Sequence, residues 1–212
     1  MHKHRHMSMK ILRRKDKMNE DLIRKEDLRI RRTRKSLTVA LFELLEKFPL
    51  EKISVIDICE TAMVHRSTFY AHFEDKYHLL NFIIDDITEE LFNKTIEMGS
   101  LTSIKQVYLN LIKSTLSFLE ENKKKFEAMI NNNKAETVYG IILNAANRCI
   151  LFFLDKIRVK DELLIPKEIF LDFFSGGIAN LALKFITSPK PYIADELINY
   201  LDLIFDEKFI LK

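Results

Sequence analysis

Residues that interrupt regular structure are scarce in this sequence. Its 212 residues include only 4 glycines and 4 prolines. An all-β fold needs many tight turns, and these two residue types supply a large share of them. Hydrophobic residues make up 47% of the chain and charged residues 31%, a balance that a disordered protein does not have. We therefore expect an all-α protein that is long enough to bury a core of its own.

The two cysteines and the apolar segments indicate a reducing, aqueous compartment. Cys59 and Cys149 lie far apart in apolar contexts, so we expect two reduced core thiols rather than a disulfide or a zinc site. The basic N-terminus is not followed by the apolar segment of a secretory signal. The longest apolar runs, such as 150–154, are too short to cross a bilayer. A cytoplasmic protein without a membrane partner is expected.

The charges are divided unevenly along the chain. Residues 1–35 carry 14 Lys and Arg against 5 Asp and Glu, whereas residues 36–212 carry 20 against 26. A basic arm on a mildly acidic body is typical of a protein that binds a polyanion. Residues 1–7, with three histidines between methionines, also look like an affinity tag, and we leave them out of any metal-site argument.

Hydrophobic periodicity predicts a series of helices after residue 28. Apolar side chains from Leu37 to Phe48 recur at helical spacing, and Pro49 ends that helix. Residues 122–125 are expected to form a polar loop, and Gly99–Ser100 a domain boundary. The expected helices are 31–47, 55–62, a short one from residue 65, one from about 76 to 91, 104–119, 126–130, 137–157, 167–186 and 193–205.

Two short helices with a tight break at 63–64, packed on a longer helix, describe a helix-turn-helix. Ser54 and Asp57 form a capping box at the start of its first helix. Phe69 and Phe73 lie four residues apart, so both can hold the second helix against the domain. The opposite face of that helix is then polar and suits a recognition helix.

The polar residues of this second helix match the chemistry of a DNA major groove. An arginine such as Arg66 can bind guanine through O6 and N7, and a threonine such as Thr68 can offer its methyl group to thymine. Two simpler interpretations remain open. Tyr70 is also compatible with a half-buried core position, and His72 with a position that only covers Phe69.

Residues 68–73 read Thr-Phe-Tyr-Ala-His-Phe and are followed by Lys76. With the preceding Ile-Ser-Val-Ile-Asp-Ile of residues 53–58, this segment resembles the DNA-binding domain of the TetR/AcrR family of transcriptional regulators. The resemblance covers about a quarter of the chain. The segment 173–178 is also similar to a branch of the family that includes activators of dihydroxyacetone-kinase operons.

The resemblance implies DNA-binding roles for ten residues. Those at 66–68 occupy base-reading positions, residue 65 is a further candidate, and the others occupy positions that contact phosphates. The set is Thr33, Arg34, Ser54, His65, Arg66, Ser67, Thr68, Tyr70, His72 and Lys76.

Three positions depart from the family's pattern. Met63 stands where glycine is frequent, so a positive φ would strain it. His65 replaces a small residue at the N-cap of the second helix, which puts its capping in doubt. Ser67 replaces a frequent glycine and adds a hydrogen-bond donor.

The resemblance implies three parts: a basic extension over 1–28, a helix-turn-helix domain over 29–80, and a helical regulatory and dimerisation domain over 81–212. A homodimer is expected because two recognition helices related by a two-fold axis read a palindromic double-stranded operator, with half-sites roughly 34–36 Å apart. The last two long helices would form the dimer interface. Its candidate residues, which would otherwise only relieve crowding inside one subunit, are Gly176, Gly177, Ala179 and Ala182.

Control by a small molecule requires a pocket in the helical domain. Aromatic residues at helical spacing are more often plain core, but they are the candidates for its lining. The set is Phe118, Phe126, Tyr139, Phe152, Phe153 and Phe174.

The expected function is a dimeric repressor that a small-molecule effector releases from its operator. The alternative is a TetR-type regulator that a partner protein controls and that acts as an activator. The three histidines at 65, 72 and 78 do not share one helix face, so no metal site is expected. No catalytic constellation or phosphate-binding loop is present in the sequence, so we expect neither an enzyme nor a cofactor.

Overall fold

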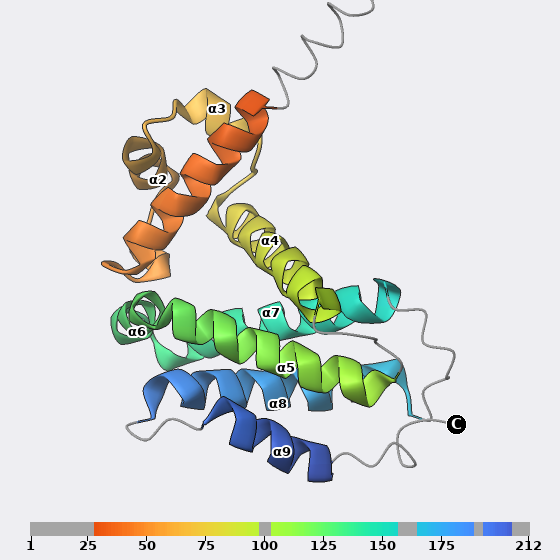
Figure 1. Ribbon diagram of the computed structural model, residues 1–212. Coiled ribbons are helices and arrows are strands. Elements are labelled where there is room, and N and C mark those ends of the chain that lie inside the picture. Colours follow the sequence, from red (N-terminus) through yellow and green to blue (C-terminus); the bar gives the residue numbers. More distant parts are fainter. Residues whose placement is uncertain (1–27, 98–102, 157–164, 189–192, 205–212) are drawn as a thin grey trace, which may run out of the picture.

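A computed structural model describes residues 28–97, 103–156, 165–188 and 193–204. Within these ranges every regular element is a helix, which confirms the expected all-α fold (Figure 1). The expected N-terminal extension, apart from residue 28, and the expected boundary at Gly99–Ser100 lie outside the described residues.

The first part of the chain forms a small helical unit, which we call the head. Leu37, Leu41 and Phe69, each with no exposed surface, are at the centre of its core. The head consists of a first helix over residues 28–45, η1 (Leu50–Lys52), α2 (Val55–Ala62), α3 (Arg66–Tyr70) and the beginning of α4 (Lys76–Glu97).

The first helix ends earlier than its hydrophobic pattern predicts. The amide groups of Lys47 and Phe48 both donate to the carbonyl oxygen of Leu44, at 3.0 and 2.8 Å, and this tight turn closes the helix. Phe48 therefore leaves the inward face on which we expected it, and its side chain is 49% exposed.

The remaining helices form a larger unit, which we call the body. It contains the end of α4 together with α5 (Ile104–Glu121), α6 (Lys123–Asn132), α7 (Ala135–Lys156), α8 (Lys167–Thr187) and α9 (Ala194–Ile204). α6 begins directly after α5, so the polar loop expected at 122–125 is wrong. Lysine has good helix propensity, and burial of Met129 on this helix holds the segment helical.

Two layers of helices enclose the core of the body. α7 packs along α8, α5 packs against α8 and α9, and α4 crosses onto α5 and α7 (Figure 1). α7 and α8 are long and apolar enough to cross a membrane by length and composition, with a mean hydropathy of 1.5. In the sequence, polar residues interrupt the apolar runs of both helices, so the length of these runs did not indicate this property. Phe153 on α7 and Phe170 on α8 are buried in the same core. The two helices thus bury part of their apolar surface against each other and against the rest of the body.

The turn between α6 and α7 contacts the head directly. The Asn132 side-chain amide donates to the carbonyl oxygen of Glu46 at 2.7 Å. The side-chain oxygen of Asn133 accepts a hydrogen bond from the amide of Leu50, also at 2.7 Å. These bonds satisfy backbone groups at the end of the first helix and at η1, and they tie the head to the body.

Candidate nucleic-acid interface

The capping box that starts α2 is present. The Ser54 hydroxyl accepts from the amide of Asp57 at 3.2 Å, and the Asp57 carboxylate accepts from the amide of Ser54 at 2.8 Å. The same hydroxyl donates to that carboxylate at 2.6 Å, and these hydrogen bonds lower the pKa of Asp57. The structure thus gives Ser54 its expected capping role, and its phosphate contact stays a prediction.

The turn between α2 and α3 requires a left-handed residue. Met63 has φ 53° and ψ 42°, and it is the one non-glycine residue with positive φ in the described ranges. Its amide donates to the carbonyl oxygen of Glu60 at 3.1 Å, and the amide of Val64 donates to that of Cys59 at 2.9 Å. These bonds close α2 and set the direction of α3. The Met63 side chain is 93% exposed, so little packing offsets the backbone strain.

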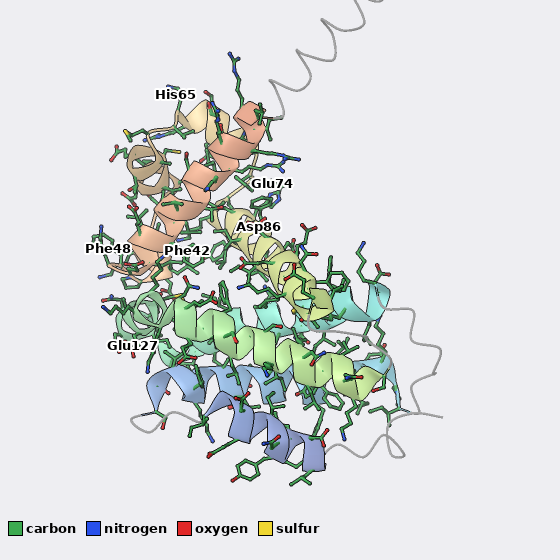
Figure 2. The ribbon with its side chains drawn as sticks, in the orientation of Figure 1. Phe42, Phe48, His65, Glu74, Asp86 and Glu127 are labelled. Atoms are coloured by element: carbon green, nitrogen blue, oxygen red, sulfur yellow. The ribbon has the colours of Figure 1, made fainter. Side chains whose placement is uncertain are left out.

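His65 caps α3 in place of a smaller residue. Its Nδ1 accepts from the amide of Ser67 at a long 3.4 Å, and it lies 2.9 Å from the Ser67 hydroxyl. Figure 2 shows His65 at the outer end of the head, on the side away from the body. The His65 side chain therefore does cap α3, but the long distance makes this a weak hydrogen bond.

Two phenylalanines hold α3 in the head. Phe69 has no exposed surface and Phe73 has 2%, as the sequence predicts. Phe73 lies beyond the last residue of α3, so the helix is shorter than expected. The ring of Phe73 packs against Phe69 at 5.8 Å and Phe82 at 5.4 Å between centroids. α3 is anchored through one side only.

The other side of α3 faces solvent. Arg66 and Ser67 are exposed and Thr68 is half-buried. Tyr70 is 58% exposed, which excludes the half-buried core position. His72 is half-buried, and its ring contacts Phe73 at 6.3 Å between centroids. The first three residues of α3, Arg66, Ser67 and Thr68, therefore offer donors and a methyl group to solvent.

Basic residues crowd the start of the first helix, which lies next to α3 in Figure 1. The Arg34 guanidinium lies 5.2 Å from the centroid of the Phe82 ring, and its Nε is buried without a partner in the described part of the chain. Thr33, like Arg34, is half-buried. Burial, with the charge of Arg34 as a smaller cause, lowers the pKa of His72. The exposed cations, which the resemblance did not single out, are Arg29, Arg31, Arg32 and Lys35.

Lys76 has a different environment from the one that the resemblance implies. Its Nζ donates to the carbonyl oxygens of Leu50 at 2.7 Å, Ile53 at 2.8 Å and Glu51 at 3.2 Å. An ammonium group has three protons, and all three are used. In the structure Lys76 therefore joins the start of α4 to η1, and its phosphate contact stays a prediction.

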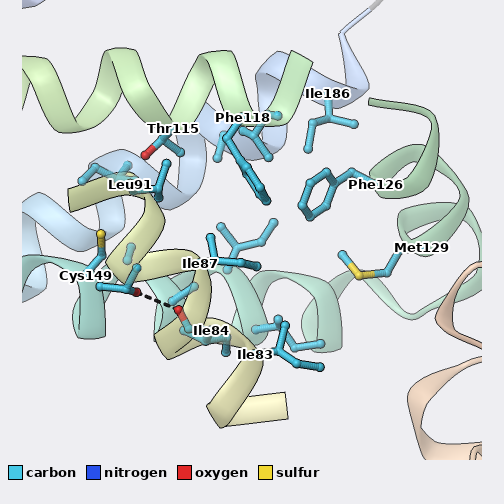
Figure 3. A pocket seen from close by; sticks show the side chains of 18 of the residues that line it. Ile83, Ile84, Ile87, Leu91, Thr115, Phe118, Phe126, Met129, Cys149 and Ile186 are labelled. Carbon is cyan, nitrogen blue, oxygen red and sulfur yellow. Dashed lines mark hydrogen bonds between the residues drawn. The ribbon is translucent and has the colours of Figure 1, made fainter. Parts of the chain in front are cut away.

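A pocket lies between the head and the body. Its volume is about 120 Å³, and two of the six predicted aromatic residues, Phe118 and Phe126, line it (Figure 3). The other four, Tyr139, Phe152, Phe153 and Phe174, do not line this pocket.

Those four residues lie on other faces of their helices. The rings of Phe152 and Phe153 pack against Phe92, at 5.2 and 5.0 Å between centroids. The ring of Phe174 packs against Tyr108 at 4.8 Å. Tyr139 on α7 is half-buried and does not border the pocket.

Three of the four predicted interface residues on α8 face into their own subunit. Ala179 and Ala182 are 0% and 4% exposed, and a Cβ on Gly177 would lie 3.3 Å from the Tyr108 hydroxyl. Of the two glycines in this set, Gly176 is the one at which a Cβ would meet nothing within 4 Å. The alternative that these small residues relieve crowding inside one subunit is therefore favoured for three of them.

In the described ranges, no group of three or more His, Cys, Asp or Glu side chains is placed to hold a metal ion.

The fold and this site define a class: all-α proteins in which an N-terminal helix-turn-helix head is joined by a long helix to a larger helical body.

Comparison with solved structures identifies the fold. A TetR regulator from Streptococcus agalactiae aligns over 84% of this chain and 96% of its own, at 19% identity and a TM-score of 0.54. Lin0861 from Listeria innocua aligns over 84% of this chain and 91% of its own, at 22% identity and a TM-score of 0.57. NalD, the secondary repressor of the MexAB-OprM efflux pump in Pseudomonas aeruginosa, aligns over 86% of this chain and 98% of its own, at 18% identity and a TM-score of 0.52. The chain has the fold of the TetR family of transcriptional regulators.

Sequence comparison gives shorter matches. The helix-turn-helix regulator YxbF of Bacillus subtilis is 29% identical over 96 residues, 43% of this chain and 25% of YxbF. DhaS of Lactococcus lactis, the activator of the dhaKLM operon, is 36% identical over 61 residues, 29% of this chain and 33% of DhaS. The matches thus span about a quarter to a third of these curated relatives. No model of a protein family matches the chain.

Proposed function

We propose that this chain is a DNA-binding transcriptional regulator that reads a palindromic operator with α3. The observation that carries the proposal is the one-sided anchoring of α3: Phe69 is buried, while Arg66 and Ser67 are exposed on the opposite side. A recognition helix needs this division, because one face must hold it and the other must reach base edges. The basic start of the first helix supplies the positive charge that phosphates attract.

A homodimer is the assembly that suits this function best. α8 exposes Ile169 at 57% and Phe173 at 72%, and α9 exposes Tyr200 at 61%, Leu203 at 82% and Ile204 at 72%. Large apolar side chains that stay exposed on these two helices are candidates for an interface. A second copy of the chain is the partner that a palindromic operator requires.

Release by a small molecule is the mode of control that we favour. The pocket lies between the head and the body, so an occupant contacts both units. A ligand shifts the equilibrium between two arrangements only by its difference in affinity for them. We propose 29–80 as the DNA-binding domain and 81–212 as the regulatory and dimerisation domain of a cytoplasmic protein without catalytic activity.

The similarity to DhaS favours a second mode of control with the same DNA-binding head. DhaS is an activator of its operon. In this alternative a partner protein binds the body and the regulator activates transcription. A thermal-shift screen separates the two: stabilisation by a small apolar compound supports the first mode, and stabilisation only by a protein supports the second.

Selection from random duplex DNA tests the function itself. The full chain is expected to enrich one palindromic sequence, with half-sites roughly 34–36 Å apart and with affinity that falls as salt rises. Mass measurement in solution should give a dimer. Binding without any enriched sequence would overturn the proposed operator recognition.

A further inference from the structure

The pocket between the head and the body is built from almost every helix that meets there. Its walls come from the first helix, α4, α5, α6, α7 and α8. Phe118 and Phe126 close one side, and their rings lie 5.8 Å apart between centroids. Figure 3 shows these rings facing Ile87 of α4 across the pocket.

Among the residues that the structure describes, no charged side chain lines this pocket. Bringing an ion into it would remove the ion's hydration without providing a partner, and that free-energy cost excludes charged ligands. Besides the apolar wall, three lining side chains carry a polar group: Thr88, Thr115 and Cys149.

Two of these three polar groups are satisfied inside the protein. The Thr88 hydroxyl donates to the carbonyl oxygen of Ile84 at 2.8 Å, the bond drawn as a dashed line in Figure 3. The Cys149 thiol is hydrogen-bonded to Thr88, and burial raises the pKa of this thiol to about 12, so it stays neutral. Both groups are parts of the wall.

The third group differs. The hydroxyl of Thr115 on α5 makes no hydrogen bond within the described residues. Thr115 is half-buried, and Figure 3 shows it among the side chains that line the pocket. A hydroxyl in an apolar wall gains a hydrogen bond if a ligand brings one polar group to it.

We propose that this pocket binds a small, uncharged, mostly hydrocarbon molecule that carries a single hydroxyl or carbonyl group, which hydrogen-bonds to Thr115. The size follows from the volume of about 120 Å³. A dry protein cavity of about 150 Å³ with a similar lining binds benzene. Phenol, a benzene ring with one hydroxyl group, is the simplest probe of the class.

The regulatory consequence, unlike the binding itself, rests on the proposed function. Phe42 and Leu45 of the first helix line the pocket beside residues of the body. The same helix carries Arg34 and the basic residues near α3. An occupant that prefers one arrangement of the head on the body shifts the DNA-binding equilibrium.

Calorimetric titration of the full-length protein with phenol, benzene and benzoate at pH 7 tests the binding. Phenol is expected to bind about fivefold or more tightly than benzene, since one hydrogen bond contributes about 1 kcal/mol. Benzoate is expected not to bind. Failure of both phenol and benzene to bind, or binding of benzoate with equal affinity, would overturn the proposal.

The variant Thr115→Val removes the hydroxyl and keeps the shape of the side chain. It should bring the affinities for phenol and benzene to within about twofold of each other, because the loss is confined to one hydrogen bond. Thr187→Val, the same change on the exposed end of α8, should leave the phenol preference intact. A phenol preference that persists in Thr115→Val refutes the role of Thr115.

A cavity-filling variant shows where the probe binds. Ala146→Leu adds three carbons to the pocket wall and should abolish binding of both phenol and benzene. Circular dichroism confirms that the variant is folded, and Ile142→Ala, which enlarges the pocket instead, should retain phenol. Undiminished binding by folded Ala146→Leu would place the probe elsewhere and refute the site.

Operator binding is measured separately on the same preparations. Loss of operator binding by all forms, with phenol still bound, would refute the proposed function and leave the pocket assignment in place. Intact operator binding without phenol binding would refute only the pocket assignment.

Discussion

The ammonium group of Lys76 donates a hydrogen bond of 2.7 Å to the carbonyl oxygen of Leu50, and two more carbonyl oxygens of the same short turn accept its other protons. Lys76→Met is expected to lower the free energy of unfolding by about 2–3 kcal/mol, because hydrogen bonds to charged groups contribute most when they are partly buried. Chemical denaturation followed by circular dichroism measures this change.

Lys52→Met is the matched control, since Lys52 is an exposed cation of the same turn. It should leave the stability nearly unchanged. If Lys76→Met kept full stability and lost only DNA affinity, the ammonium would act on phosphates rather than on the turn.

The backbone of Met63 predicts an unusual stabilising substitution. At φ 53°, Met63→Gly relieves about 1–2 kcal/mol of left-handed strain. Part of that gain is offset by the greater freedom of glycine in the unfolded chain, about 0.4–1 kcal/mol. We expect a net rise in the midpoint of thermal unfolding. Met63→Ala, which keeps the strain, should not raise it, and an equal rise in both variants would show that the side chain itself was unfavourable.

Neighbouring residues of α3 should respond in opposite ways to truncation. Phe69→Ala removes a fully buried ring and is expected to cost about 3–5 kcal/mol of stability. Tyr70→Ala, at an exposed position, should change stability by less than about 0.5 kcal/mol and reduce DNA affinity instead. Thermal unfolding and mobility-shift titration of both variants measure the two effects. A large loss of stability in Tyr70→Ala would mean that Tyr70 is part of the core.

His72 gives the head a pH dependence with a definite sign. Burial, and secondarily the Arg34 charge, places its pKa below the ordinary value of 6.5. As pH falls below about 6.5, the unfolded chain takes up this proton before the folded chain does, so stability decreases with falling pH. NMR titration of the imidazole should give a pKa below 6.5. Arg34→Gln should raise it only partly, and an unshifted pKa in the parent protein would contradict the environment described here.

Local sequence determines the helix-turn-helix to a large extent. The α2 bounds, 55–62, and its capping box were predictable because the groups involved lie within three residues of one another. The burial of Phe69 and Phe73 follows from their spacing. The positive φ of Met63 was predictable because glycine is frequent at this position in the family.

Long-range partners could not be predicted. The Lys76 ammonium binds carbonyl oxygens 23 to 26 residues away, a contact that only the folded chain creates. Helical spacing shows that Phe118 and Phe153 both face a core, but it does not show which of them borders a void. Of the four small residues of α8, Gly177, Ala179 and Ala182 face into their own subunit, and this could not be predicted because a sequence does not show which neighbouring helix packs against Ala179.

The base-reading role of Arg66 is the central claim, and selection of DNA sequences by the parent protein and by Arg66→Ala tests it most directly. Arg66 is exposed at the start of α3, so the variant should fold normally. We predict a loss of about 1–3 kcal/mol in operator affinity and a relaxed preference at one position in each half-site. Lys47→Ala, in the turn that follows the other end of the first helix, should keep the preference. Selection of an unchanged sequence by Arg66→Ala would contradict the account.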